Sequence, residues 1–163
     1  MLYYCIYKKE IYEKILNSGY IEGDKCEYMF QKKYDWLMNQ MEKRIPGYKK
    51  ENGLVFLWTK KPDLRTTGHL NKGEEGVLIT VDLPESRVLL SNFIAWHCVL
   101  NNIKAELYEN EKIDKFKSWE RIFDLKLCSS EASSYFAYDD KVQGCTSKIS
   151  IKNIKSIRFF KSK

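Results

Sequence analysis

The chain has 163 residues, the size of one domain with an adequate core, and we expect a single domain over residues 1–163. Hydrophobic residues make up 44% of it and charged residues 31%. No apolar run approaches the ~20 residues of a membrane-spanning helix, which excludes an integral helical membrane protein. The N-terminal residues lack a basic leader followed by an apolar stretch, so we expect a cytoplasmic protein.

The formal charge of +6 would suit a nucleic-acid partner. However, the basic residues are not interleaved with glycines and aromatics as in RNA-binding sheets, so solvated surface lysines are the better interpretation. The five cysteines show no CxxC spacing, which favours reduced thiols over a disulfide framework. The only histidines, His69 and His97, lie in different segments, and we therefore expect no metal site.

In the first half of the chain, β-branched and aromatic residues predict a strand at Leu2–Tyr7. Helical spacing of apolar residues predicts helices at Glu10–Ser18 and Tyr28–Arg44, and on the longer helix one apolar face is expected to pack on a sheet. The continuous apolar run Leu54–Thr59 predicts a strand. The polar segment Lys60–Gly76 that follows predicts a long loop, and such loops are often functional.

In the second half, strands are expected first around the turn at Pro84, and Asn92 is a plausible N-cap for a helix that ends near Asn102. Lys104–Lys117 is expected to be an exposed helix or insertion, and Ser118–Leu127 a helix. The remaining predicted elements are strands at Val77–Leu83, Arg87–Ser91, Tyr135–Tyr138, Gly144–Ile151 and Ser156–Phe160, with a one-turn helix at Lys152–Ile154. The order predicts an α+β fold with a mixed or split antiparallel sheet and helices packed on it.

Polar residues stand in the apolar middle of the chain, where their burial costs free energy, and this indicates a site. His97 and Asn101 are spaced i, i+4 on the expected helix and can share one ligand, and His97 is the obvious general acid or base. A hydrogen-bonded structural histidine is the common alternative. In the polar loop, Arg65 offers a planar fork for a phosphate or carboxylate, or else pairs with Asp63. For Arg121 we expect a helix ion pair with Glu120 or Asp124.

These segments resemble an uncharacterised family of small bacterial and phage proteins, a domain of unknown function. The similarity covers nearly the whole chain apart from Tyr48–Gly53 and Ala105–Lys117. It rests on Trp58 with Lys61-Pro62-Asp63-Leu64-Arg65, on Gly73, Gly76-Val77-Leu78-Ile79, Val88-Leu89-Leu90-Ser91-Asn92-Phe93, Trp96-His97, Val99-Leu100-Asn101-Asn102, Ser118-Trp119-Glu120-Arg121-Ile122-Phe123-Asp124 and Gln143. The resemblance implies membership of that family and no particular activity.

A second, weaker resemblance is to small ADP-ribosyltransferase-like domains, which begin with a strand, a helix and a glycine and end with a strand bearing an acidic residue. Here Tyr4 stands where those domains often place Arg or His, and Gln143 stands near the catalytic acid. The resemblance implies that the chain binds NAD and transfers ADP-ribose to a macromolecule, protein or nucleic acid, in conflict between bacteria and phages. It assigns the catalytic roles to His97 and Gln143, and cofactor binding to Trp58, Arg65, Trp96 and Asn101.

The alternative is a non-catalytic protein-binding module, such as a phage-encoded inhibitor of a host nuclease. In that case the basic surface imitates or displaces nucleic-acid contacts, and the tryptophans are core residues or interface anchors. A small RNA-processing enzyme that uses His97 as a base also fits the charge, but it would need a second histidine.

Overall fold

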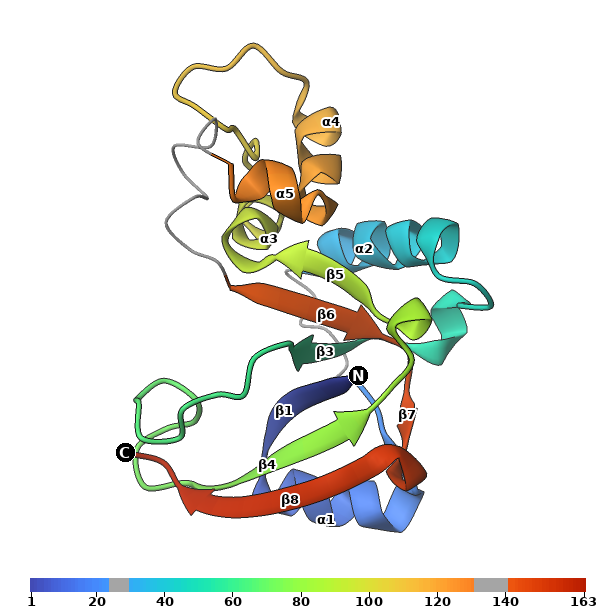
Figure 1. Cartoon of the computed structure of the whole chain (residues 1–163), viewed down its shortest axis with the longest axis vertical. Coiled ribbons are helices and arrows are strands. Elements are labelled where there is room, and N and C mark those ends of the chain that lie inside the picture. The colour runs from blue at the N-terminus through green and yellow to red at the C-terminus, as the bar shows by residue number, and fades with distance from the viewer. Residues whose placement is uncertain (24–29, 131–140) are drawn as a thin grey trace.

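A computed structural model describes residues 1–23, 30–130 and 141–163, and it contains the helices and strands of an α+β fold, as predicted (Figure 1). The strands are β1 (Leu2–Lys8), β2 (Tyr20–Ile21), β3 (Val55–Trp58), β4 (Glu75–Asp82), β5 (Leu89–Asn92), β6 (Val142–Thr146), β7 (Ile149–Ser150) and β8 (Ile154–Lys161). The α-helices are α1 (Lys9–Ser18), α2 (Gln31–Arg44), α3 (Phe93–Leu100), α4 (Lys115–Glu120) and α5 (Leu125–Cys128). Single 3-10 turns are η2 (Lys50–Asn52), η3 (Glu85–Arg87), η4 (Arg121–Phe123) and η5 (Ile151–Asn153). None of the helices in these ranges is long and apolar enough to cross a membrane.

The main sheet has six antiparallel strands in the order β5-β6-β3-β1-β4-β8. A second, two-stranded sheet joins β2 to β7. Helices pack on the main sheet, so the predicted fold class is confirmed. The predicted strand Gly144–Ile151 is divided between β6 and β7, and the predicted strand at Tyr135–Tyr138 lies outside the described residues.

The two faces of the main sheet are buried by different helices, because side chains alternate along each strand. One face of β1, β3 and β4 forms a hydrophobic cluster with α1, in which Tyr3, Ile15 and Ile79 are buried. The opposite face of β3, β5 and β6 packs against α2 and α3, where Leu37, Trp96 and Cys145 are buried. The helices therefore form two layers on opposite faces, and of the strands named here only β3 is covered by both.

Helix α2 carries the apolar face that the sequence predicts. Leu37 and Met41 are buried, and Tyr34 and Met38 are partly buried against the same cluster. The predicted span was Tyr28–Arg44. In the structure Phe30 is the N-cap and the helix runs from Gln31 to Arg44, while the first two predicted residues lie outside the described ranges.

The segment between α3 and β6 differs from three expectations. Residues 104–114 are not a simple exposed insertion, because Ala105, Leu107 and Glu111 are buried. The predicted helix Ser118–Leu127 is broken into α4, η4 and α5, and α4 begins earlier, where the Asp114 carboxylate accepts a hydrogen bond from the Lys117 amide. Arg121 pairs with Glu111 at 2.7 Å and not with Glu120 or Asp124, so that prediction was wrong. The partner comes from a loop, which helical spacing cannot reveal.

The sheet is split between β1 and β3. Strand β1 pairs with β4 along its whole length, from Leu2 opposite Asp82 to Lys8 opposite Gly76. Its ladder with β3 contains the single pair Tyr4 and Trp58. Beyond that pair the two strands diverge, and the space between them opens into a pocket.

Candidate functional site

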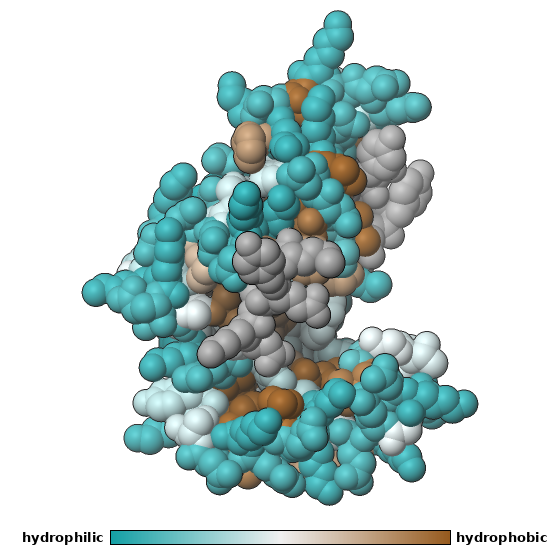
Figure 2. Space-filling model, turned by 180° about the vertical axis from the view of Figure 1, so that it is seen from behind, coloured by the Kyte–Doolittle hydropathy of each residue, from teal (hydrophilic) through white to brown (hydrophobic). Residues whose placement is uncertain are grey.

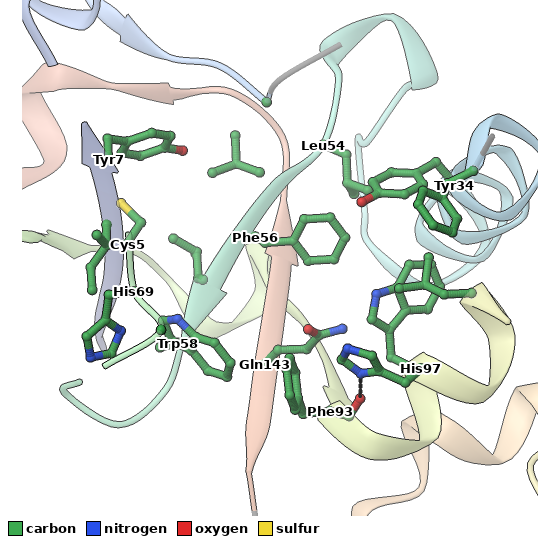
Figure 3. A pocket seen from close by; sticks show the side chains of 18 residues that line it. Cys5, Tyr7, Tyr34, Leu54, Phe56, Trp58, His69, Phe93, His97 and Gln143 are labelled. Carbon is green, nitrogen blue, oxygen red and sulfur yellow. Dashed lines mark hydrogen bonds between the residues drawn. The ribbon is translucent and has the colours of Figure 1, made fainter. Parts of the chain in front are cut away.

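A pocket of about 680 Å³ lies where β1 and β3 diverge (Figure 3). One wall comes from β1, the floor from β3, and the other wall from α2 and α3, while the loop before β4 reaches the rim. The lining residues in the described part of the chain are Cys5, Ile6, Tyr7, Gly23, Phe30, Tyr34, Leu54, Val55, Phe56, Leu57, Trp58, Gly68, His69, Phe93, Trp96, His97, Leu100 and Gln143. A pocket of this size with mainly apolar walls and few polar groups is typical of small-ligand sites.

Aromatic rings make up the wall formed by α2 and α3 and the adjoining floor on β3. The ring centroid of Tyr34 lies 5.6 Å from that of Phe56 and 5.9 Å from that of Trp96, both in edge-to-face geometry. Nearer the rim, the Trp58 ring lies 5.0 Å from the Phe93 ring. Such contacts favour these ring orientations, so the wall presents a surface of packed rings against which a flat ligand can stack.

His97 extends this row of rings, at 4.4 Å from Phe93 between ring centroids. Its position follows from local helix chemistry, because Asn92 caps α3 by accepting a hydrogen bond from the Ala95 amide at 2.9 Å, as the sequence predicts. The His97 Nδ1 lies 2.8 Å from the Phe93 carbonyl oxygen. A carbonyl oxygen can only accept, so Nδ1 carries the proton, and in the neutral ring Nε2 is the proton acceptor.

Gln143 is the buried polar residue of the pocket. It lies on β6 opposite Trp58 of β3 and opposite Ser91 of β5, and Trp58 in turn lies opposite Tyr4 of β1. Directly opposite residues share one face of a sheet, so these four side chains form a row across the split. The Gln143 Nε2 donates to the Ser91 Oγ at 3.3 Å, which directs the amide, and Figure 3 shows Gln143 and His97 among the side chains that line the pocket.

His69 enters the pocket from the loop between β3 and β4. Its Nε2 lies 2.9 Å from the Asp63 carbonyl oxygen and therefore donates, which leaves Nδ1 as the acceptor of the neutral ring. The same carbonyl accepts hydrogen bonds from the amide and hydroxyl of Thr66. No role for His69 follows from the sequence. Its place after Gly68 in a long polar loop was the only available signal, and the fold brings it to the same pocket as His97.

Arg65 and Asn101 are not among the residues that line the pocket. Arg65 forms a fork with the Asp63 carboxylate, with Nη2 to Oδ2 at 2.8 Å, and its side chain is 84% exposed. This hydrogen bonding holds the pKa of the Asp63 carboxyl well below its usual range. The Asn101 side chain donates to the His97 carbonyl oxygen at 2.8 Å, and so it closes the end of α3. Of the six residues assigned to a site from the sequence, the other four, Trp58, Trp96, His97 and Gln143, line this pocket.

No Asp, Glu, Lys or Arg lines the pocket in the described part of the chain. The thiol of Cys5 is no substitute for a charged group, because burial raises its pKa to about 12 and keeps it protonated. Within the same residues no group of three or more His, Cys, Asp or Glu side chains could hold a metal ion. The described lining therefore offers a ligand stacking, hydrogen bonding by amide and tyrosine hydroxyl groups, and imidazole proton transfer.

Fold and site thus define an α+β domain with an aromatic pocket at a split in its antiparallel sheet. The chain belongs to the family described as a domain of unknown function (DUF3841), whose model matches residues 2–104. That match spans β1 to α3 and contains Trp58, Trp96 and His97, while Gln143 lies beyond it. No curated protein and no solved structure matches the chain.

Proposed function

We propose that the chain binds NAD or a related nucleotide in the pocket at the split between β1 and β3, as an ADP-ribosyltransferase-like domain acting in the cytoplasm. The observation that carries this proposal is the combination of fixed aromatic rings with the His97 imidazole and the Gln143 amide around one cavity. Aromatic side chains stack on nucleobases and on nicotinamide, because every such ring has a π face.

Each part of the nucleotide has a candidate partner. A flat ring stacks against Trp58 or Trp96, and the Gln143 Oε1 accepts a hydrogen bond from a ribose hydroxyl, since its Nε2 is already directed to Ser91. Arg65 receives a phosphate at the rim, provided that the phosphate replaces Asp63 in its fork. Asn101 caps α3 behind His97, and so it supports the site from outside the cavity.

The proposed reaction is the transfer of ADP-ribose to a protein or nucleic acid, in conflict between bacteria and phages. The bond between the ribose C1′ and the pyridinium nitrogen breaks, and its electron pair leaves with neutral nicotinamide. A hydroxyl or amine of the target forms the new bond to C1′, and its proton passes to the His97 Nε2. Gln143 offers only a dipole to the developing cation, whereas a carboxylate would offer a full charge, so we expect slow turnover.

Titration with NAD under tryptophan fluorescence tests this proposal directly. Trp58 and Trp96 line the pocket, whereas Trp36 and Trp119 pack against one another elsewhere, with ring centroids 5.5 Å apart. We expect saturable quenching that is weakened at least about tenfold by Trp58→Ala and unaffected by Trp36→Phe. Absence of quenching at millimolar NAD, or equal affinity in both variants, would refute nucleotide binding here.

Release of nicotinamide tests the catalytic part separately. His97→Ala should lower it by about 10²–10⁴-fold while NAD still binds, because only the proton acceptor is removed. If NAD binds but wild type and variant release nicotinamide equally slowly, the domain is a nucleotide sensor and not a transferase.

The second candidate function is a protein-binding module, such as a phage-encoded inhibitor of a host nuclease. It is favoured by the lack of any carboxylate among the described residues that line the pocket, and by the long β8 strand, which pairs only with β4 in the described part of the chain. This module would bind its partner without NAD, so recovery of a defined complex in a nucleotide-free preparation would support it.

A further inference from the structure

We propose that the free edge of β8 is a docking site for an acidic, extended protein segment, which adds to the main sheet as a further antiparallel strand. This inference does not depend on the pocket. The two edges of the sheet differ: β5, at one end, contacts η4 and α5, whereas β8, at the other end, pairs only with β4 among the described residues (Figure 1).

The direction of the peptide groups on β8 follows from the bonds at its end. The Ser162 amide donates to the Glu74 carbonyl oxygen at 2.9 Å, and the Ser162 carbonyl oxygen accepts from the Gly73 amide at 2.8 Å. Both groups of Ser162 thus point toward the β4 side. The direction of the backbone groups alternates along a strand. The amides and carbonyls of Phe160 and Arg158 therefore also point toward β4, and those of Lys161, Phe159 and Ile157 point away from it.

The side chains of this edge are apolar on one face. Ile157 and Phe159 lie opposite Ile79 and Val77 of β4, on the face that α1 covers, and the Phe159 ring contacts the Tyr12 ring edge-to-face at 5.8 Å. Even so, Ile157 is 41% exposed and Phe159 is 54% exposed. From behind, apolar residues are visible among polar ones at the end of the molecule where Figure 1 places α1, β4 and β8 (Figure 2). An added strand would cover these two side chains.

The charge of the segment that contains β8 specifies the partner. Residues 141–163 contain seven Lys and Arg and no Asp or Glu. The rest of the chain contains the other 21 basic residues and all 22 acidic ones, so the positive charge is concentrated in this segment. Of the cations on β8, Lys155 is paired with Asp82, while Arg158 and Lys161 are exposed and have no ion pair to the described residues. Like charges opposed across strands are destabilising, which disfavours a second copy of β8, and lysines on edge strands serve that purpose. An acidic strand would instead place opposite charges beside Arg158 and Lys161.

The experiment measures binding of a short peptide of alternating Glu and Val to the full chain by fluorescence anisotropy. Valines would lie over Ile157 and Phe159, and glutamates near Arg158, on the other face. We expect saturable binding that weakens with salt, and Arg158→Glu should lower the affinity at least about fivefold. The matched control is Lys126→Glu, the same charge change at an exposed site on α5, which should leave binding within about twofold. No binding, or equal loss in both variants, overturns the proposal.

Amide hydrogen exchange by NMR then distinguishes strand addition from other modes. In the free protein the outward amides of Ile157, Phe159 and Lys161 should exchange fast, and those of Arg158 and Phe160 slowly. The peptide should slow the outward set alone. A single-stranded DNA oligonucleotide of the same net charge is the second probe. If the DNA binds more tightly than the peptide, or if the peptide binds without this alternating protection, then the edge is an electrostatic surface for nucleic acid and the proposal is wrong.

Discussion

The ion pair between Glu111 and Arg121 fastens the irregular segment after α3 to the rest of the domain, and its removal is the sharpest test of this arrangement. The Arg121 Nη1 and Nη2 donate to the two Glu111 carboxylate oxygens at 2.7 and 2.8 Å. One of these oxygens also accepts from the Leu107 amide at 3.0 Å. The perturbation is Arg121→Met, which keeps the length of the side chain and removes both donors.

The expected magnitude follows from the exposure of the pair. The Glu111 side chain is 10% exposed and that of Arg121 is 22% exposed, so the variant leaves a largely buried carboxylate that keeps its hydrogen bond from the Leu107 amide. Removal of one partner from such a pair costs about 3 kcal/mol of unfolding free energy. Urea denaturation at neutral pH, followed by tryptophan fluorescence, measures this loss. A loss below about 0.5 kcal/mol would show that the pair contributes only as a solvated surface contact.

The same pair predicts a pH dependence. Hydrogen bonding to Arg121 lowers the pKa of Glu111 in the folded state. A carboxyl group with a lowered folded-state pKa contributes stability that is fully present above its unfolded pKa of about 4.3 and is lost as the pH falls through the folded-state pKa. The difference in stability between wild type and Arg121→Met should therefore shrink on acidification below about pH 4.

Arg44→Met is the control for that experiment, because Arg44 lies over the Phe123 ring at 4.7 Å and hydrogen-bonds to the neutral Gln40 side chain. Its effect on stability should not change over the same pH range. If the Arg121 difference is independent of pH while the Arg44 difference is not, the assignment of the titrating group to Glu111 is refuted.

Three further outcomes follow from burial. Leu37→Ala should lower the unfolding free energy by ~2–5 kcal/mol in urea denaturation, since Leu37 is 1% exposed, and a change below ~0.5 kcal/mol would contradict its place in the core. Gly23→Ala should abolish NAD binding in the fluorescence titration and lower the melting temperature, because a Cβ there would lie 1.7 Å from the Leu54 carbonyl oxygen; unchanged binding would show that the backbone moves freely. Iodoacetamide at mildly alkaline pH should leave Cys5 and Cys145 unmodified until the protein unfolds, because burial raises the pKa of both thiols, and peptide mapping that finds either one labelled in the native state would contradict this.

Local chemistry made much of the fold predictable. The apolar face of α2, the cap at Asn92 and the one-turn helix at η5 are encoded within a few residues, and the structure contains all three. The α+β class followed from the order of such segments. Where an element depends on a distant partner, prediction was wrong: the expected helix at Ser118–Leu127 is broken, and Arg121 of η4 pairs with Glu111 of a loop.

In the candidate site, too, features encoded by neighbouring residues could be predicted, and features that depend on distant contacts could not. The i, i+4 spacing of His97 and Asn101 was visible in the sequence, but it could not show that Asn101 bonds to the backbone of His97 and not to the cavity. Nor could spacing place His69 at the rim, because its position depends on bonds within an irregular loop. Gln143 was singled out through the family resemblances and not through the expected strand, which began at Gly144, and strand register then set it opposite Trp58.

The single ladder pair between β1 and β3 has a consequence for how the domain can diversify. Where paired strands separate, the main chain itself borders the opening, so an occupant meets peptide groups as well as rings. Main-chain contacts do not depend on side-chain identity. A change of the ring at Trp58 or Phe93 would therefore alter the side-chain walls of the opening and leave its main-chain border in place.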